Sequence, residues 1–248
     1  MKILVTCKQV PDPDIKIKIN ATGDGISTDG MKYVANYFDE IANEEALRIT
    51  EKGGGEVVVV GIGPKDISQQ IRGMLAMGSA RAIHVVTDAK PDSDAVARIL
   101  AKVVEQEKPD LILMGKQATD DDACQAGQIL AQILGYPQAC YASKVAVDGT
   151  KATVVREVDG GLETVEMTSP ALITCDLRLN EPRYASLPNI MKAKKKEIKE
   201  VAPDALGVSP TPKVKIVKYQ TPPERKAGQK VKTVDELVDK LLNEAKVL

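Results

Sequence analysis

Short apolar runs alternate with helix-like amphipathic stretches over the first 135 residues of the chain. The runs at 2–7, 57–60, 82–87 and 110–114 have the length and β-branched content of buried strands. Stretches with helical spacing lie at 38–52, 66–77, 92–107 and 123–134, and the first of them ends at three consecutive glycines. This alternation predicts βαβ units, and therefore an α/β fold with a doubly wound, mostly parallel sheet.

After residue 135 the pattern changes to strand-like segments at 144–147, 153–158, 162–167 and 171–175. We expect these to be antiparallel additions at an edge of the parallel sheet. Residues 176–212 have little periodicity and many prolines, and a strand-like piece at 214–217 precedes a last helix with a capping box, Thr233 to Glu236. That helix has an apolar stripe that must pack on its own domain or on another chain, formed by Val234, Leu237, Val238, Leu241 and Leu242.

Aromatic residues make up only 3% of the chain, which holds six Tyr, one Phe and no Trp. Aliphatic side chains must fill the core, and recognition of nucleic acid by stacked bases is disfavoured. The single histidine, His84, argues against a His-based catalytic dyad or a multi-His metal site, and we expect it to be structural. Glu44 and Glu45 are expected on the solvent face of the first helix.

Charge and cysteine usage point to a partner and a compartment. The net charge is −1, yet residues 190–232 hold twelve Lys or Arg against four Asp or Glu, so a basic arm follows an acidic body. The four cysteines form no C-x-x-C pair, the N-terminus has no signal pattern, and the apolar runs fall far short of the ~20 residues that span a bilayer. We expect a cytoplasmic protein without membrane insertion, with the mitochondrial matrix as the alternative.

The segment 111–127 is the first candidate site, because it reads as a strand, a polar loop and a helix that begins in small residues. Ligands of open α/β sheets bind beyond the carboxyl ends of strands, and a helix N-terminus there suits a phosphate. One alternative is that Asp120, Asp121 and Asp122 only cap the helix. A magnesium site is less favoured, since no Walker-type lysine loop accompanies the acidic run. The turn 61–64 lacks the spacing of a dinucleotide fingerprint and is expected to be structural.

The second candidate is the segment 176–196, in which apolar side chains lie beside charges and between prolines. An exposed Leu or Met among basic residues can enter a partner's pocket while the cations steer the encounter. The alternative is that Leu187, Ile190 and Met191 pin a surface helix.

Motifs along the whole chain closely resemble the β subunits of electron-transfer flavoproteins. The resemblance is carried by residues 4–8, 28–30, 115–118, 156–163 and 176–196, in order. A free-standing nucleotide-binding sensor would share the α/β core but not the block 176–200.

The resemblance implies an electron carrier and not an enzyme. In such an αβ heterodimer, FAD is held mainly by the α subunit and AMP lies in the β subunit. Electrons pass from acyl-CoA dehydrogenases of fatty acid oxidation toward a membrane quinone reductase. It also implies an adenine-nucleotide-binding domain at 1–190, and an arm and helix at 191–248 that embrace the α subunit.

Site residues follow from the resemblance position by position. AMP would contact Thr6, Asn36, Tyr37, Phe38, Asp39, Ile62, Gly115, Gln117, Asp120, Asp121, Asp122, Ala123, Cys124, Gln125, Ala126 and Gly127. Glu157 would lie near the flavin. The residues that dock onto the dehydrogenase would be Tyr184, Leu187, Pro188, Asn189, Ile190 and Met191.

The chain departs from the family pattern at two places. Cys124 and Ala126 stand where Asn and Thr are typical, which leaves the phosphate to backbone N–H groups. A branch that bifurcates electrons binds a second FAD in place of AMP and resembles D-G-D-T-A-Q-V-G here. Asp121 replaces the glycine of that motif, which favours the AMP-binding branch. Bifurcation with a second FAD stays the alternative.

Overall fold

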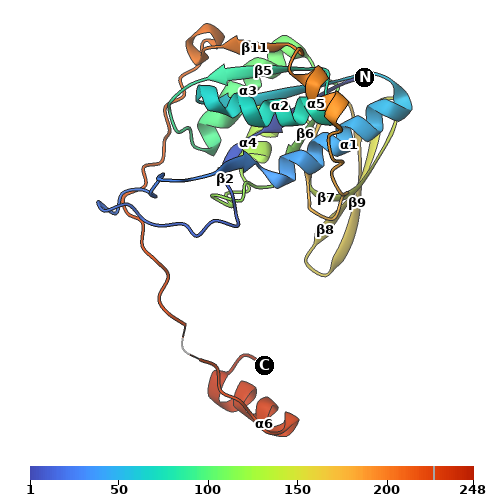
Figure 1. Cartoon of the computed structure of the whole chain (residues 1–248). Helices are drawn as coiled ribbons and strands as arrows, with labels where there is room; N and C mark the ends of the chain where they lie inside the picture. Colours follow the sequence, from blue (N-terminus) through green and yellow to red (C-terminus); the bar gives the residue numbers. More distant parts are fainter. Residues whose placement is uncertain (226) are drawn as a thin grey trace. The chain divides into compact units, whose positions relative to one another are not determined.

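The computed structural model describes residues 1–225 and 227–248 (Figure 1). Contacts divide the chain into two units, which we describe separately. The main unit comprises residues 1–17 and 27–216, and the tail unit comprises residues 18–26 and 217–248. Residues 191–216 thus belong to the same unit as the α/β core.

A nine-stranded sheet forms the centre of the main unit, in the order β11-β5-β4-β1-β6-β10-β7-β8-β9. Its strands are β1 (Lys2–Cys7), β4 (Glu56–Gly63), β5 (Arg81–Val86), β6 (Leu111–Gly115), β7 (Gln138–Asp148), β8 (Lys151–Val158), β9 (Gly161–Thr168), β10 (Ala171–Cys175) and β11 (Ile198–Val201). All neighbours from β11 to β7 are parallel, and β7-β8-β9 is antiparallel. Two short strands, β2 (Gln9–Pro11) and β3 (Tyr33–Ala35), pair separately.

Helices cover both faces of the sheet, as a doubly wound fold requires. They are α1 (Tyr37–Gly53), α2 (Ser68–Met77), α3 (Ser93–Glu107), α4 (Ala126–Leu134) and α5 (Leu187–Ala193). Successive residues of β1 point to opposite faces of the sheet. Ile3 packs in the core under α1 and α2, whereas Leu4 packs in the core under α3 and α4. The predicted α/β class and the mostly parallel sheet are therefore confirmed.

The position of β10 corrects one expectation. It is not an antiparallel edge addition, because it lies between β6 and β7 and runs parallel to both. All five of its residues are buried, which is typical of a central parallel strand. The antiparallel edge consists of residues 144–148 of β7, which pair with β8, together with β8 and β9.

Other corrections concern the segments after residue 176 and the first helix. The segment 187–193 is a helix and 198–201 pairs with β5, although the sequence shows little periodicity there. Residues 214–217 form no strand. Glu44 and Glu45 are buried and not on a solvent face, because side chains from the loop after β10 cover them.

The tail unit contains α6 (Val234–Asp239), continued by a π-helical turn at Lys240–Ala245. The predicted cap is confirmed, since the Thr233 side chain accepts a hydrogen bond from the Glu236 N–H. Within this unit the apolar stripe is largely solvent-exposed, with Val234 at 74%. The embrace of an α subunit by 191–248 stays a prediction.

Two helical glycines should respond oppositely to alanine. A Cβ on Gly127 of α4 would lie 2.6 Å from Thr174 Cγ2, whereas a Cβ on Gly73 of α2 would meet no atom within 4 Å. We expect Gly73→Ala to stabilise the protein by about 0.5–1 kcal/mol and Gly127→Ala to destabilise it by about 1–3 kcal/mol. Thermal unfolding of both variants checks the pair, and equal shifts would contradict the close packing of α4 on β10.

Candidate functional site

The strand order reverses between β1 and β6. From β1 the chain adds β4 and β5 on one side, and then crosses to place β6 on the other side. The crevice beyond the carboxyl ends of two such strands is where open α/β sheets bind ligands. Most of the predicted nucleotide-binding residues lie around this crevice.

Asp39, in the first turn of α1, links the two strands at this point. Its carboxylate accepts hydrogen bonds from Thr6 Oγ1 at 2.8 Å, from the Lys8 N–H at 2.9 Å and from the Gly115 N–H at 3.0 Å. Burial raises the pKa of Asp39, against the lowering effect of these hydrogen bonds. Asp39 also helps to raise the pKa of Glu40, although burial contributes more.

Gly115 allows α1 to approach the end of β6. A Cβ there would lie 2.7 Å from Phe38 Cβ and 2.9 Å from Asp39 Oδ1, so any larger residue would displace the helix. The next residue, Lys116, pairs with Asp176 at 2.6 Å, and its ammonium lies 5.5 Å from the centroid of the Phe38 ring. The crevice wall is therefore tightly packed.

Asn36 precedes α1 without capping it through its side chain. Instead, its Nδ2 donates to the Gln117 carbonyl at 2.9 Å, and its Oδ1 accepts from the Thr119 N–H at 3.3 Å. This amide fixes the loop after β6 against the start of α1.

The acidic run does not cap α4, so the capping alternative is wrong. Lys8 Nζ binds Asp120 at 2.7 Å and Asp121 at 2.9 Å, while Asp122 accepts a hydrogen bond from Gln117 Nε2 at 2.6 Å. Burial lowers the pKa of Lys8, but the two carboxylates outweigh it and the net direction is upward. The three aspartates therefore order the loop.

The helix predicted from residue 123 begins at Ala126, with Gln125 as its N-cap residue. Asp122 and Cys124 have φ angles of 48° and 52°, which break the helix geometry. Left-handed backbone is uncommon for residues other than glycine and clusters at functional sites. The predicted small residues, Ala126 and Gly127, form the first turn of α4.

The structure brings together most, but not all, of the predicted residues. One hydrogen-bonded network, joined through Lys8, connects Thr6, Asn36, Asp39, Gly115, Gln117, Asp120, Asp121, Asp122, Ala123 and Cys124. Ile62 lies near the carboxyl end of β4, beside β1. Glu157 and the segment 184–191 are on other elements, β8 and the region of α5. Lys8 is a site residue that was not predicted, although its place directly after an apolar run was a signal in the sequence.

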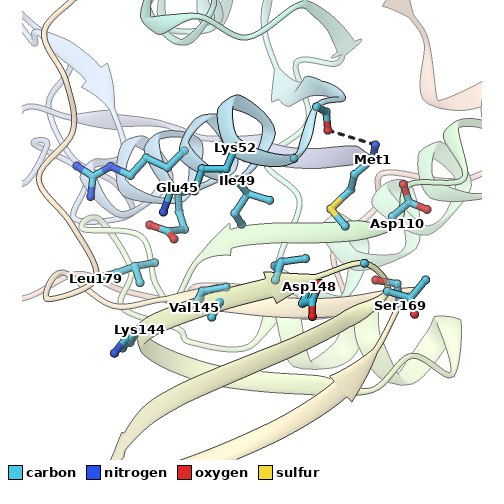
Figure 2. Close-up of a pocket in the computed structure, with 17 residues that line it drawn as sticks. Met1, Glu45, Ile49, Lys52, Asp110, Lys144, Val145, Asp148, Ser169 and Leu179 are labelled. Carbon is cyan, nitrogen blue, oxygen red and sulfur yellow. Dashed lines mark hydrogen bonds between the residues drawn. The ribbon is translucent and has the colours of Figure 1, made fainter.

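A cleft of about 830 Å³ lies elsewhere, between α1 and β7 (Figure 2). Met1, Gly54 and Asp110 line it, so it is at the amino-terminal edge of the sheet, opposite to the edge where α/β folds bind ligands. Glu45 also lines it, and burial raises the pKa of this carboxyl. A smaller cleft of about 320 Å³ includes Tyr37 and Thr119 and adjoins the start of α1.

The described residues include no helix with the length and apolarity needed to cross a membrane.

Asp39→Asn tests the link between β1 and β6. Whichever way the new amide turns, its NH₂ group faces the N–H of Lys8 or of Gly115, and we expect a loss of about 1–3 kcal/mol in stability. Thr6→Val is the control, because it removes one donor and leaves both backbone donors satisfied. Chemical denaturation measures both variants. An unchanged midpoint for Asp39→Asn would mean that relief of the buried charge offsets the lost hydrogen bond.

Comparison with known proteins places the chain in a family. Residues 25–206 match the model of the electron transfer flavoprotein domain. The chain is 54% identical, over the full length of both, to the electron transfer flavoprotein subunit beta of Bradyrhizobium diazoefficiens. It is 50% identical, again over both full lengths, to the mitochondrial subunit beta of Oryza sativa subsp. japonica, and 49% identical to the Homo sapiens subunit beta over 97% of this chain and 96% of the relative. The chain belongs to the electron transfer flavoprotein family, and within it to the β subunits.

Proposed function

We propose that the protein is the β subunit of a heterodimeric electron carrier that pairs with an electron-transfer flavoprotein α subunit and has no substrate chemistry of its own. The carrier takes electrons from acyl-CoA-type dehydrogenases of fatty acid oxidation and passes them toward a membrane quinone reductase. The observation that carries this proposal is an exposed apolar tip, residues 184–191, held beside a row of lysines on a folded body.

The tip, which we call the docking segment, suits a partner's pocket. Tyr184, Leu187 and Met191 are exposed by 101%, 79% and 61%. Exposed lysines follow it at positions 192, 194 and 195. Large apolar side chains at the centre of a contact supply affinity, and cations around them steer an acidic partner. The alternative in which Leu187, Ile190 and Met191 pin α5 is disfavoured, because all three are exposed and Ala193 is the buried residue of that helix.

The crevice where the strand order reverses, between β1 and β6, would hold AMP in a structural role. Its phosphate would meet the backbone of residues 123–127, where α4 begins, and Thr6, Asn36 and Tyr37 would lie around the nucleotide. The paired aspartates support a site whose loop is already ordered, and Cys124 contributes no charge there. A nucleotide that binds only the folded chain would stabilise it by mass action.

The flavin would be shared, with the α subunit providing most of the contacts. Glu157, at the end of β8, lies beside Arg178, with which it forms an ion pair. We place this pair at the border with the α subunit, near the flavin. The four thiols are free, in keeping with a reducing compartment, which we propose is the cytoplasm, with the mitochondrial matrix as the alternative.

The nucleotide content of the purified heterodimer tests whether the chain belongs to the AMP-binding branch or to the bifurcating branch of the family. We expect denaturation to release one AMP and one FAD per heterodimer, because Asp121 occupies the glycine position of the bifurcating motif. Chromatography of the released nucleotides gives the ratio. Two FAD and no AMP would assign the chain to the bifurcating branch.

Leu187→Ala tests the docking segment. Removal of a side chain that is 79% exposed should leave folding and flavin content intact, but should weaken electron transfer from an acyl-CoA dehydrogenase by about tenfold or more. Val214→Ala is a matched control, because Val214 is 68% exposed and lies near the start of α3. Stopped-flow reduction of the flavin measures the rate, and equal rates in both variants would exclude the docking role.

A further inference from the structure

The docking segment is fixed to the body of the protein on both sides, although the sequence around it has little periodicity. Residues 180–183 contact α1, and residues 193–196 contact α2. Between these two anchors the side chains are mostly exposed.

The first anchor is Arg183 on the side of α1. Its Nε binds Glu44 at 2.6 Å and its Nη2 binds Glu51 at 3.0 Å, so one guanidinium joins two carboxylates a little under two helical turns apart. The Glu44 side chain is only 3% exposed, and Arg48 Nε binds its other oxygen at 2.6 Å. The planar fork of arginine suits two carboxylates, whereas lysine offers a single point charge.

Asn180 and Glu181 strengthen the same anchor. Asn180 Nδ2 donates to the Ile41 carbonyl at 3.1 Å and to Glu45 Oε2 at 3.0 Å. Arg48 Nη2 donates to the Glu181 carbonyl at 3.2 Å. The chain therefore reaches Tyr184 with its direction already set.

The second anchor joins the carboxyl ends of α2 and α5, because a side chain near each helix binds backbone carbonyls at the end of the other. Lys196 Nζ donates to the carbonyls of Leu75 and Ser79, at 2.9 and 2.6 Å, and so caps the carboxyl end of α2. In return, Arg72 of α2 donates to the Ala193 carbonyl at 2.6 Å, at the end of α5. Beyond Lys196 the chain enters β11, which pairs with β5.

We propose that Arg183, Arg72 and Lys196 are positioning residues that hold the docking segment in one conformation before the dehydrogenase arrives. The inference rests on the proposed docking function and adds how the segment achieves it. A segment that is ordered in advance loses less conformational freedom on binding, so a given apolar contact yields more affinity. Arg183 is the principal member, because it is the last anchored residue before the exposed tip.

The experiment uses the purified FAD-containing heterodimer with Arg183→Gln. Two quantities are measured: amide hydrogen exchange of residues 184–193, and steady-state electron transfer from an acyl-CoA dehydrogenase with the flavoprotein as varied substrate. We expect exchange and the KM for the flavoprotein each to rise by about tenfold, with kcat unchanged, because only the ordering before binding is lost. The flavin absorbance spectrum reports whether the heterodimer is intact.

Three variants make the result specific. Arg183→Lys should give a KM and an exchange rate between those of the wild type and of Arg183→Gln. It also provides a folded variant to measure if Arg183→Gln folds poorly. Leu187→Ala should raise the KM without changing exchange. Lys102→Gln on α3, which removes an exposed cation paired with Glu105, should change neither quantity.

Two outcomes for Arg183→Gln would overturn the inference. Unchanged exchange in Arg183→Gln would mean that the ion pairs do not order the segment, and raised exchange at a constant KM would mean that order does not contribute to docking. A normal KM in Leu187→Ala would instead reject the docking function itself, and the inference with it. The exchange measurement thus separates a failure of the anchors from a failure of the function.

Discussion

The carboxylate of Asp39 is the contact on which the arrangement of the main unit depends. It lies at the point where the strand order reverses and accepts hydrogen bonds from both central strands. The chain leaves the paired strands β1 and β6 toward helices on opposite faces of the sheet, α1 and α4, and a crevice between these connections would expose unpaired N–H groups. By satisfying the N–H groups of Lys8 and Gly115 at once, Asp39 closes the base of the crevice and fixes α1 to it. Its burial opposes ionisation, and the three donors offset that cost in part.

Helix α1 connects the two regions to which function is assigned. Its first residues, with Asn36 before them, shape the crevice, and two to four turns later Glu44 and Glu51 hold the loop that leads to the docking segment. Displacement of this helix would therefore disturb both regions. If the proposed AMP binds at the start of α1, it would stabilise the same helix that positions the segment, and this would give the nucleotide a structural role apart from electron transfer.

Local patterns in the sequence were sufficient for the strands and helices of the core but not for contacts between distant residues. The apolar runs predicted β1, β4, β5 and β6 because central parallel strands are buried on both faces. The place of β10 depends on pairing with β6, some 60 residues earlier in the chain, and no local pattern encodes that pairing. Glu44 was assigned to the surface because its partner, Arg183, is 139 residues away. The capping alternative for the acidic run could not be rejected from the sequence for the same reason, since Lys8 lies 112 residues from Asp120.

The positions of the few aromatic residues bear on how a flavin could be bound. Phe38 is buried in the wall of the crevice and has Lys116 against its ring, and Tyr184 projects from the docking segment. Phe38 is already covered within the main unit, and in the proposed docking role Tyr184 would contact a partner protein and not a flavin. With six Tyr, one Phe and no Trp, the chain has few rings to stack on a flavin, so under the proposed function we expect the α subunit to supply most of those contacts. Under the proposed function, this chain would contribute an ordered crevice and a docking segment held at both ends, and the α subunit would provide most of the surroundings of the flavin.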